Sequence, residues 1–289
     1  QKIHPDIVHG QDLVFAGIWA YLSGFRPLLI TCWGSDVNNY PTFYWLERLL
    51  ISRALKSADL VTGTSKAIGR QAEKIGLEKN KWRLVHFGIN LNIFKNKKFS
   101  NREKIIFCPR AIGPIYNTDI LISAFAIIAK KEKEVKLALL ENIQDENYLL
   151  AIEKMIIKYN LVDRVIFWPK ISNKKMVNYY NRAEVVVSIS SSDGCSVSVL
   201  EAMASEKKIV VTDLTYIKEW LLTKLAKRRN IWLVPLRNVK VTSEAILTVL
   251  RLPSKDWQEI GKMNHQLIIE QADEDQSFTK LNDIYQGLL

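Results

Sequence analysis

The sequence predicts an α/β protein built on parallel β-sheets. Short runs rich in Val, Ile and Leu alternate with longer segments of helical periodicity, an order typical of βα units. Residues 185–189 are nearly continuous in apolar side chains, as expected for a strand that is covered on both faces. The chain has 289 residues, which suits two domains of ordinary size.

The first domain is assigned to residues 1–90. Strands are predicted at 6–9, 27–32, 59–62 and 82–86, and helices at 13–23, 42–57 and 65–75. Ser65 is a favourable N-cap for the last of these helices, and Gly76 stands just past its end. Residues 91–104 are polar, rich in Asn and Lys, and without apolar periodicity, so we expect them to link two domains.

The second domain is assigned to residues 105–255, where the βα order restarts. Strands are predicted at 104–108, 135–140, 165–168, 185–189 and 208–212, and helices at 118–129, 147–159, 173–182 and from 198 onward. Residues 256–289 are predicted to be helical and to be able to pack back on the first domain.

The composition excludes several classes of protein. Apolar residues make up 48% and charged residues 25% of the chain, values that are normal for a globular protein. No apolar run is long enough to span a bilayer, and no signal peptide pattern opens the chain. Three cysteines, Cys32, Cys108 and Cys195, lie in or beside apolar runs, which favours reduced thiols and a cytoplasmic protein. The four histidines show no metal-type spacing, so neither a metal nor a resident cofactor is expected.

The charge balance favours anionic partners. The chain has 41 Lys and Arg against 30 Asp and Glu, a formal net charge of +11. Nucleotide diphosphates, phospholipid headgroups and nucleic acids would all be attracted by such a field. The basic clusters have no interleaved aromatic residues and no recognised nucleic-acid motif, so nucleic acid is not an expected partner.

The most informative segment is 190–204, where a Ser/Asp/Gly turn joins a predicted strand to a predicted helix. Two carboxylates, Asp193 and Glu201, stand eight positions apart in it. A helix N-terminus placed at a strand end can bind an anion through its free N–H groups and dipole. The alternative is a buried β-turn-α unit in which Asp193 only caps the helix.

Residues 193–204, D-G-C-S-V-S-V-L-E-A-M-A, resemble the D/E-x7-E signature of retaining glycosyltransferases with two Rossmann-like domains, the GT-B architecture. That family reads roughly E-G-F-G-L-V-x-L-E-A-M-A, and the S-D-G-x-S-V-S form belongs to one of its branches. Similar matches occur at 5–9 (P-D-I-V-H), 58–65 and 87–94, so the resemblance covers almost the whole chain. Family members have a Gly-rich strand–turn–helix before the P-D-I-V-H segment, where this chain has four residues. The resemblance therefore implies a first domain that lacks its first half.

The resemblance implies a reaction and a site. It implies metal-independent, retaining transfer of a hexose-type sugar from a nucleotide-diphosphate donor to a glycan or lipid-linked acceptor. Arg110 would bind the pyrophosphate, Asp193 the sugar hydroxyls and Glu201 the ribose. The other residues implied in donor binding are Asn117, Gly194, Cys195, Ser196, Val197 and Ser198.

The implied acceptor side is the segment Trp33, Gly34 and Asp36, which resembles a [HW]-G-x-D motif. Trp33 could stack on a sugar or fill the core. Asp36 could serve the site or be an ordinary loop acid, and Arg110 could simply end a strand at the surface.

Some residues depart from the family pattern. Tyr116 and Asn117 replace a Lys-Gly pair, in the P-x-Y-N form of the same branch, which removes one cation from the diphosphate site. Glu206 and Ile231 stand where the family has glycine, and Lys208 where it has proline. Lost glycines remove freedom for positive φ. A catalytically silent relative that binds or acts as a scaffold is therefore the alternative function.

Residues 43–53 combine aromatic side chains with Arg48 and Arg53. An interfacial helix on an anionic membrane has this composition, and peripheral membrane contact is one expectation. A helix that covers the first sheet would also have an apolar face.

Overall fold

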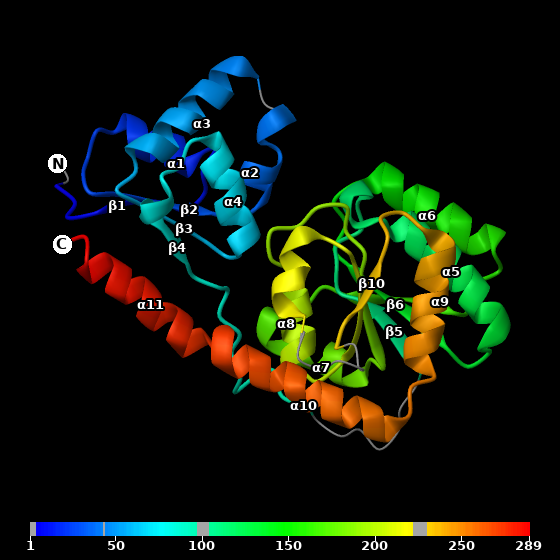
Figure 1. Cartoon of the computed structure of the whole chain (residues 1–289). Helices are drawn as coiled ribbons and strands as arrows, with labels where there is room; N and C mark the ends of the chain where they lie inside the picture. Colours follow the sequence, from blue (N-terminus) through cyan, green and yellow to red (C-terminus); the bar gives the residue numbers. More distant parts are fainter. Residues whose placement is uncertain (1–3, 43, 97–103, 222–229) are drawn as a thin grey trace.

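The structure is a computed structural model that describes residues 4–42, 44–96, 104–221 and 230–289. Within these residues the chain forms two parallel sheets, of four and six strands, each with its own helices (Figure 1). The predicted α/β class with two Rossmann-like domains is confirmed. None of the helices in the described residues combines the length and the hydropathy that crossing a bilayer requires.

The first sheet has the strand order β1-β2-β3-β4, and all its pairs are parallel. The strands are β1 (Val8–Gly10), β2 (Leu28–Cys32), β3 (Leu60–Gly63) and β4 (Trp82–Leu84). The helices are α1 (Ala16–Leu22), α2 (Ser35–Asn38), α3 (Trp45–Ser57) and α4 (Lys66–Ile75). Ser65 caps α4 as predicted, because its hydroxyl accepts a hydrogen bond from the Ile68 N–H at 3.2 Å.

The second sheet has the strand order β10-β9-β8-β5-β6-β7. Its strands are β5 (Ile105–Cys108), β6 (Lys136–Glu141), β7 (Val165–Pro169), β8 (Val185–Ser188), β9 (Lys208–Thr212) and β10 (Trp232–Val234). The chain moves outward from β5 to β6 and β7, then returns to the other side of β5 with β8, β9 and β10. The strand order therefore reverses between β5 and β8.

The helices of the second half are α5 (Thr118–Lys131), α6 (Glu146–Lys158), α7 (Asn173–Arg182), α8 (Val197–Ala204), α9 (Val239–Leu250), α10 (Ser254–Gln271) and α11 (Glu274–Gln286). The helical tail predicted for 256–289 is two helices rather than one. The break follows from Asp273, which caps α11 by accepting the Gln276 N–H at 3.1 Å.

The sequence analysis missed the short helix α2, the strand β10 and the helix α9. Strand β10 has three residues, too few for a periodicity argument. Helix α9 begins after Asn238, whose side chain accepts the Val241 N–H at 3.0 Å, so a recognisable cap was present. The helix predicted from residue 42 begins at Trp45, because Tyr40–Thr42 form a separate 3₁₀ turn. The basic run 224–229 and part of the predicted linker, 97–103, lie outside the described residues.

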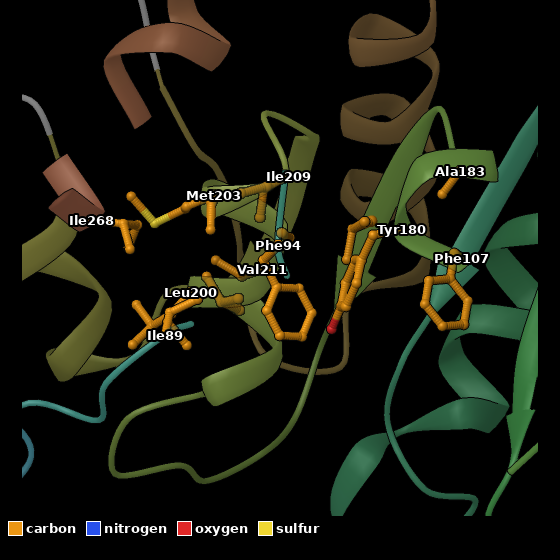
Figure 2. Close-up of a cluster of buried hydrophobic side chains, with 14 of the residues drawn as sticks. Ile89, Phe94, Phe107, Tyr180, Ala183, Leu200, Met203, Ile209, Val211 and Ile268 are labelled. Carbon is orange, nitrogen blue, oxygen red and sulfur yellow. The ribbon is translucent and has the colours of Figure 1, made fainter. Parts of the chain in front are cut away.

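Each sheet has its own hydrophobic core, and the second sheet is covered on both faces. One of these clusters joins parts of the chain that are far apart in sequence. Figure 2 shows Ile89 and Phe94, from the connection between the domains, in one cluster with Leu200 of α8 and Ile268 of α10. The start of the C-terminal tail therefore belongs to the core of the second sheet.

The tail then passes to the first sheet (Figure 1). The Ile89 N–H donates to Ala272 O at 2.8 Å, and the Glu274 N–H donates to Ile89 O at 3.3 Å. Further along α11, the Tyr285 hydroxyl lies 2.6 Å from Nδ1 of His9, beside β1. The two halves of the molecule are thus bridged by α10 and α11 as well as by the connection at residues 85–96.

Candidate active site

The reversal of strand order between β5 and β8 marks the place where an α/β sheet forms a crevice. Ligands of such sheets bind outside the carboxyl ends of the strands at this switch point. Arg110 follows β5, and the loop 189–196 follows β8. The two segments that the sequence analysis singled out therefore meet at the edge of the second sheet where a ligand is expected.

Arg110 lies across the first turn of α8. Its Nη1 donates to Ser196 Oγ at 2.9 Å and to Ser198 Oγ at 3.4 Å. Its Nη2 lies 3.0 Å from Oδ2 of Asp193, and both side chains are about 15% exposed (15% and 14%). The guanidinium also stacks over the Tyr116 ring, 4.7 Å from the ring centre. An arginine, a carboxylate and two hydroxyls are thus gathered at one helix N-terminus.

Several polar atoms at this place are buried without a hydrogen-bond partner among the described residues: Arg110 Nε, Asp193 Oδ2 and Ser190 Oγ. The contact between Asp193 and Arg110 is an ion pair that lacks hydrogen-bond geometry. Buried polar groups without partners are costly, at about 1–3 kcal/mol each. A ligand that offers both anionic oxygens and hydroxyl groups would satisfy them.

The loop residues divide into those that present side chains and those that do not. Cys195 is 4% exposed and belongs to the core, where burial raises the pKa of its thiol. Val197 packs against the same core. Gly194, Cys195 and Val197 can therefore serve a ligand only through their backbone. Ser196 and Ser198 present hydroxyl groups, and both hydroxyl oxygens accept hydrogen bonds from Arg110.

Glu201 is 4% exposed and sits deeper than the sequence analysis expected. Its two carboxylate oxygens accept hydrogen bonds from Asn173 Nδ2 and from the Tyr180 hydroxyl, both at 2.7 Å. Burial raises the pKa of Glu201 and raises the pKa of Tyr180 well above its usual value. Asn173 and Tyr180 come from α7, and no motif pointed to either of them. A ribose would have to share or replace these two partners.

Asn117 is buried and contacts the loop after β8, and the donor-binding role implied for it stays a prediction. Its side chain is fully buried, and its backbone is left-handed at φ +52°. The amide donates to Ile189 O at 2.7 Å and to Ser191 Oγ at 2.9 Å, and its oxygen accepts from Arg237 at 2.7 Å. Asparagine adopts this conformation more easily than most residues, which explains its use where the family has glycine. Asn117 therefore holds the loop after β8 in place, and Arg237 is a support that the sequence analysis missed.

Asp36 has a structural role in the loop after β2, and its implied place on the acceptor side stays a prediction. It is 6% exposed and accepts backbone N–H groups of Leu13, Trp33, Gly34 and Val37, at 2.7–3.1 Å. Four such bonds fix the loop that follows β2. Trp33 remains 36% exposed and stacks on Phe87 at 5.0 Å, so one edge of its ring can still reach a ligand.

The loops after β2 and β8 touch each other through two glycines. A Cβ on Gly34, which has φ +127°, would lie 2.5 Å from the Gly194 Cα. A Cβ on Gly194 would lie 2.4 Å from the Trp33 carbonyl oxygen. Only glycine fits at either position, because the obstacles are backbone atoms. The two segments that the sequence analysis assigned to the acceptor side and to the donor side are therefore in direct contact.

A second contact between the two domains caps a helix. The Glu219 carboxylate accepts the N–H groups of Lys66 and Ala67, at 2.9 and 2.8 Å, in the first turn of α4. Beside it lies a cavity of about 370 Å³, lined by residues 191–194 on one side and by α4 on the other. Arg70 and Lys74 contribute positive charge to its α4 wall. Within the described chain, no group of three His, Cys, Asp or Glu side chains could hold a metal ion.

Comparison with protein families gives two matches. The model of the family described as "Glycosyl transferases group 1" matches residues 90–268. The model described as "Glycosyltransferase Family 4" matches residues 1–93. The first match contains the whole crevice between β5 and β8, and the second contains the loop after β2.

Two relatives among curated proteins are distant. The Bacillus subtilis (strain 168) protein TuaC, named as a teichuronic acid biosynthesis glycosyltransferase, is 23% identical over 219 residues, 74% of this chain and 54% of its own length. Mannosylfructose-phosphate synthase of Agrobacterium fabrum is 24% identical over 173 residues, 54% of this chain and 38% of its own length. This chain thus spans about half or less of the relatives that it matches.

Solved structures share the fold at low identity. Anabaena HepE, crystallised with UDP and glucose, superposes with a TM-score of 0.84 at 16% identity, covering 98% of this chain and 78% of that one. Sucrose-phosphate synthase from Thermosynechococcus elongatus gives 0.84 at 19% identity, covering 98% and 73%. The fold is the GT-B fold, and the first family match extends over more than half of the chain. The protein is therefore a member of the group 1 glycosyl transferases.

Proposed function

We propose that the protein transfers a hexose-type sugar from a nucleoside diphosphate sugar to a glycan or lipid-linked acceptor, with retention at the anomeric carbon and without a metal ion. The observation that carries this proposal is the Arg110–Asp193 pair on the first turn of α8, at the reversal of strand order. The UDP in the HepE crystal makes UDP-sugars the first donors to test. The three free, buried thiols are in keeping with a cytoplasmic protein.

In this proposal, the donor diphosphate takes over the Arg110 guanidinium from Asp193. A planar guanidinium binds phosphate oxygens in pairs, and the α8 N-terminus adds its dipole and N–H groups. Negative charge grows on the diphosphate as the sugar leaves, so these donors stabilise the transition state more than the ground state. They also compensate in part for the lysine that the family pattern has and this chain lacks.

Asp193, once released from Arg110, is free to accept hydrogen bonds from the sugar hydroxyls. The bond between the sugar C1 and the diphosphate oxygen breaks, and a bond from C1 to the acceptor oxygen forms on the same face. The proton of the acceptor hydroxyl passes to the leaving phosphate oxygen. No protein nucleophile is required by this route.

The test is calorimetric binding of UDP and UDP-glucose to wild type, Arg110→Ala, Asp193→Asn and the control Arg251→Ala. Arg251 pairs with Glu132 at 2.9 Å on an exposed surface outside the crevice. Loss of a charge-assisted contact costs about 2–3 kcal/mol, so Arg110→Ala should bind UDP about 30- to 150-fold more weakly. Asp193→Asn should bind UDP as tightly as wild type or more tightly, because a competing anion is gone, but should lose turnover. Wild-type affinity in Arg110→Ala would remove the assignment.

The rival function is a silent relative that binds nucleotide sugars without transferring them. The observation in its favour is that the site has one arginine, already paired with Asp193, where the family pattern has two cations. Donor hydrolysis by the wild-type chain separates the two functions, since a transferase leaks some donor to water. UDP-glucose binding with no hydrolysis at high enzyme concentration would favour the silent relative.

A further inference from the structure

The outer faces of α1 and α3 carry a group of exposed aromatic and aliphatic side chains, here called the aromatic face. On and beside α1 it consists of Phe15, Trp19, Leu22 and Phe25, and at the start of α3 of Tyr44, Trp45, Leu46 and Leu49. Their exposed fractions run from 39% for Leu49 to 81% for Tyr44. Large apolar side chains gathered at one place on a surface mark an interaction site.

The helical period explains why these side chains point outward. On α3, Ile51, Ala54 and Leu55 are buried against the first sheet. Trp45 and Leu49 lie one turn apart on the opposite side, and Arg53 and Lys56 continue the same stripe. The stripe thus changes from aromatic and aliphatic to basic along one helix.

Helix α1 adds a second stripe next to the first. Phe15, Trp19 and Leu22 follow a spacing of four and three residues, while Gly17 and Ala20 are buried beneath them. The two helices pack against each other. Phe15, at the start of α1, lines a cavity together with Trp33 and Asp36, so this end of the aromatic face borders the loop after β2. Figure 1 shows both helices on the first domain.

The charges around the aromatic face are mainly positive. Arg53 and Lys56 are exposed and form no ion pair among the described residues. The neighbouring acids are already engaged. Asp12 accepts the Phe15 N–H at 2.6 Å, Glu47 the Tyr44 N–H at 2.9 Å, and Asp59 pairs with Arg26 at 3.0 Å. Arg53 and Lys56 therefore lie beside the aromatic face without an ion pair among the described residues. The nearby carboxylates accept hydrogen bonds from the backbone or pair with Arg26.

We propose that the aromatic face docks the protein on an anionic lipid bilayer. Tryptophan, tyrosine and phenylalanine insert at the headgroup level, and adjacent Lys and Arg bind acidic headgroups. A symmetric dimer through the same face would bring Arg53 and Lys56 of two copies together, which like-charge repulsion opposes. The docking does not depend on sugar transfer, although it would hold the crevice near a lipid-linked acceptor.

The experiment is co-sedimentation with vesicles in the absence of donor. Vesicles of phosphatidylcholine with about 30% phosphatidylglycerol are compared with vesicles of phosphatidylcholine alone, at low salt where the Debye length is about 10 Å. The variants are Trp19→Ser/Trp45→Ser and Arg53→Gln/Lys56→Gln. Their matched controls lie on the second domain: Ile157→Ser, at a side chain 65% exposed on α6, and Lys130→Gln/Lys131→Gln at the end of α5.

Wild type is expected to bind the anionic vesicles and not the neutral ones. Each cation near an anionic surface contributes roughly a fivefold gain, so Arg53→Gln/Lys56→Gln should lower the partition coefficient about 25-fold. Salt at about 1 M, where the Debye length is about 3 Å, should weaken wild type to a similar degree. Tryptophan fluorescence of bound wild type should shift to the blue, and less so in Trp19→Ser/Trp45→Ser. Both controls should behave as wild type.

Three results would overturn the proposal. These are no binding to anionic vesicles, equal binding to neutral vesicles, or full binding by both double variants with wild-type circular dichroism. Sedimentation equilibrium tests the alternative that a second copy of the chain covers the aromatic face. A wild-type dimer that Trp19→Ser/Trp45→Ser converts to a folded monomer, with no vesicle binding, would assign the face to a second copy. Because no donor is present, failure here leaves the transferase assignment untouched.

Discussion

Glu219 offers the sharpest test of how the two domains hold together. Its carboxylate comes from the segment after β9 and accepts two N–H groups at the start of α4, in the other domain. The first N–H groups of a helix have no partner within the helix, and a carboxylate there also meets the positive end of the dipole. We predict that Glu219→Ala weakens the contact between the domains and lowers the free energy of unfolding.

The magnitude follows from the contacts. Hydrogen bonds to a charged group contribute about 1.5–3 kcal/mol each when both ends are buried. Lys66 is exposed and Ala67 half-buried, so water can replace the carboxylate, and we take about 1 kcal/mol for each bond. Arg70, at 3.9 Å from Glu219 and 54% exposed, adds little. The expected loss is about 2 kcal/mol for Glu219→Ala and about half of that for Glu219→Gln, which keeps one acceptor.

The assay is urea unfolding followed by circular dichroism and by tryptophan fluorescence. Ser65→Ala is the matched control, because it removes a cap from the same helix without crossing between domains. In that variant the two probes should still report one transition, whereas in Glu219→Ala they should separate as the domains uncouple. A loss below about 0.5 kcal/mol in Glu219→Ala with coincident transitions would refute the reasoning.

Three other predictions follow from the backbone and from one histidine. Gly34→Ala should lower the free energy of unfolding by at least about 2 kcal/mol in urea titrations, because backbone strain and a clash with backbone atoms add. Its control is Gly24→Ala, at φ +73° with nothing near its Cβ, which should lower it by only about 1 kcal/mol. Equal losses in the two variants would show that the Gly34–Gly194 contact does not matter. Glu206 has φ +55°, so Glu206→Gly should raise the melting temperature through strain relief of up to about 1 kcal/mol, and a lower value would contradict this. Burial lowers the pKa of His9 to about 4, so the unfolded chain takes up a proton first as pH falls below about 6.5. The free energy of unfolding should therefore fall from about pH 6.5 toward pH 4, by less than about 1.4 kcal/mol per pH unit because His9 is partly exposed. In urea titrations at several pH values, His9→Gln should flatten this slope.

The sequence was sufficient for the fold class and for the place of the crevice. Strands such as β8 and β9 are short apolar runs bounded by turn residues, and they can be read from composition alone. Arg110 and Asp193 were expected to bind different parts of one donor, and the structure places their side chains 3.0 Å apart. Whether they bind a donor remains a prediction.

What the sequence did not reveal are side-chain partners across elements. Asp36 was assigned to the acceptor side because residues 33–36 resemble a [HW]-G-x-D motif. The resemblance did not reveal that four backbone N–H groups, three of them in the tight loop after β2, donate to its carboxylate. Glu201 was placed on the right helix, but its partners Asn173 and Tyr180 come from α7, about 20 to 30 residues away in sequence. The local sequence pattern shows which residues lie on one helix or strand. Only the packing of different elements decides which polar side chains form hydrogen bonds with one another.

In the proposed mode of donor binding, the positions of Arg110, Asp193, Gly194 and Gly34 couple the donor to the contact between the domains. A diphosphate that takes Arg110 from Asp193 removes an ion pair that helps to hold residues 191–194. The next residue, Gly194, packs on Gly34 with no room for a single extra carbon. Any shift of this loop is therefore transmitted to the first domain without a compressible layer between them. Linkage then makes the effect reciprocal: the factor by which opening of the glycine contact changes the affinity for the donor equals the factor by which the donor changes the opening equilibrium. A substitution that opens the contact, such as Gly34→Ala, should therefore change the donor affinity.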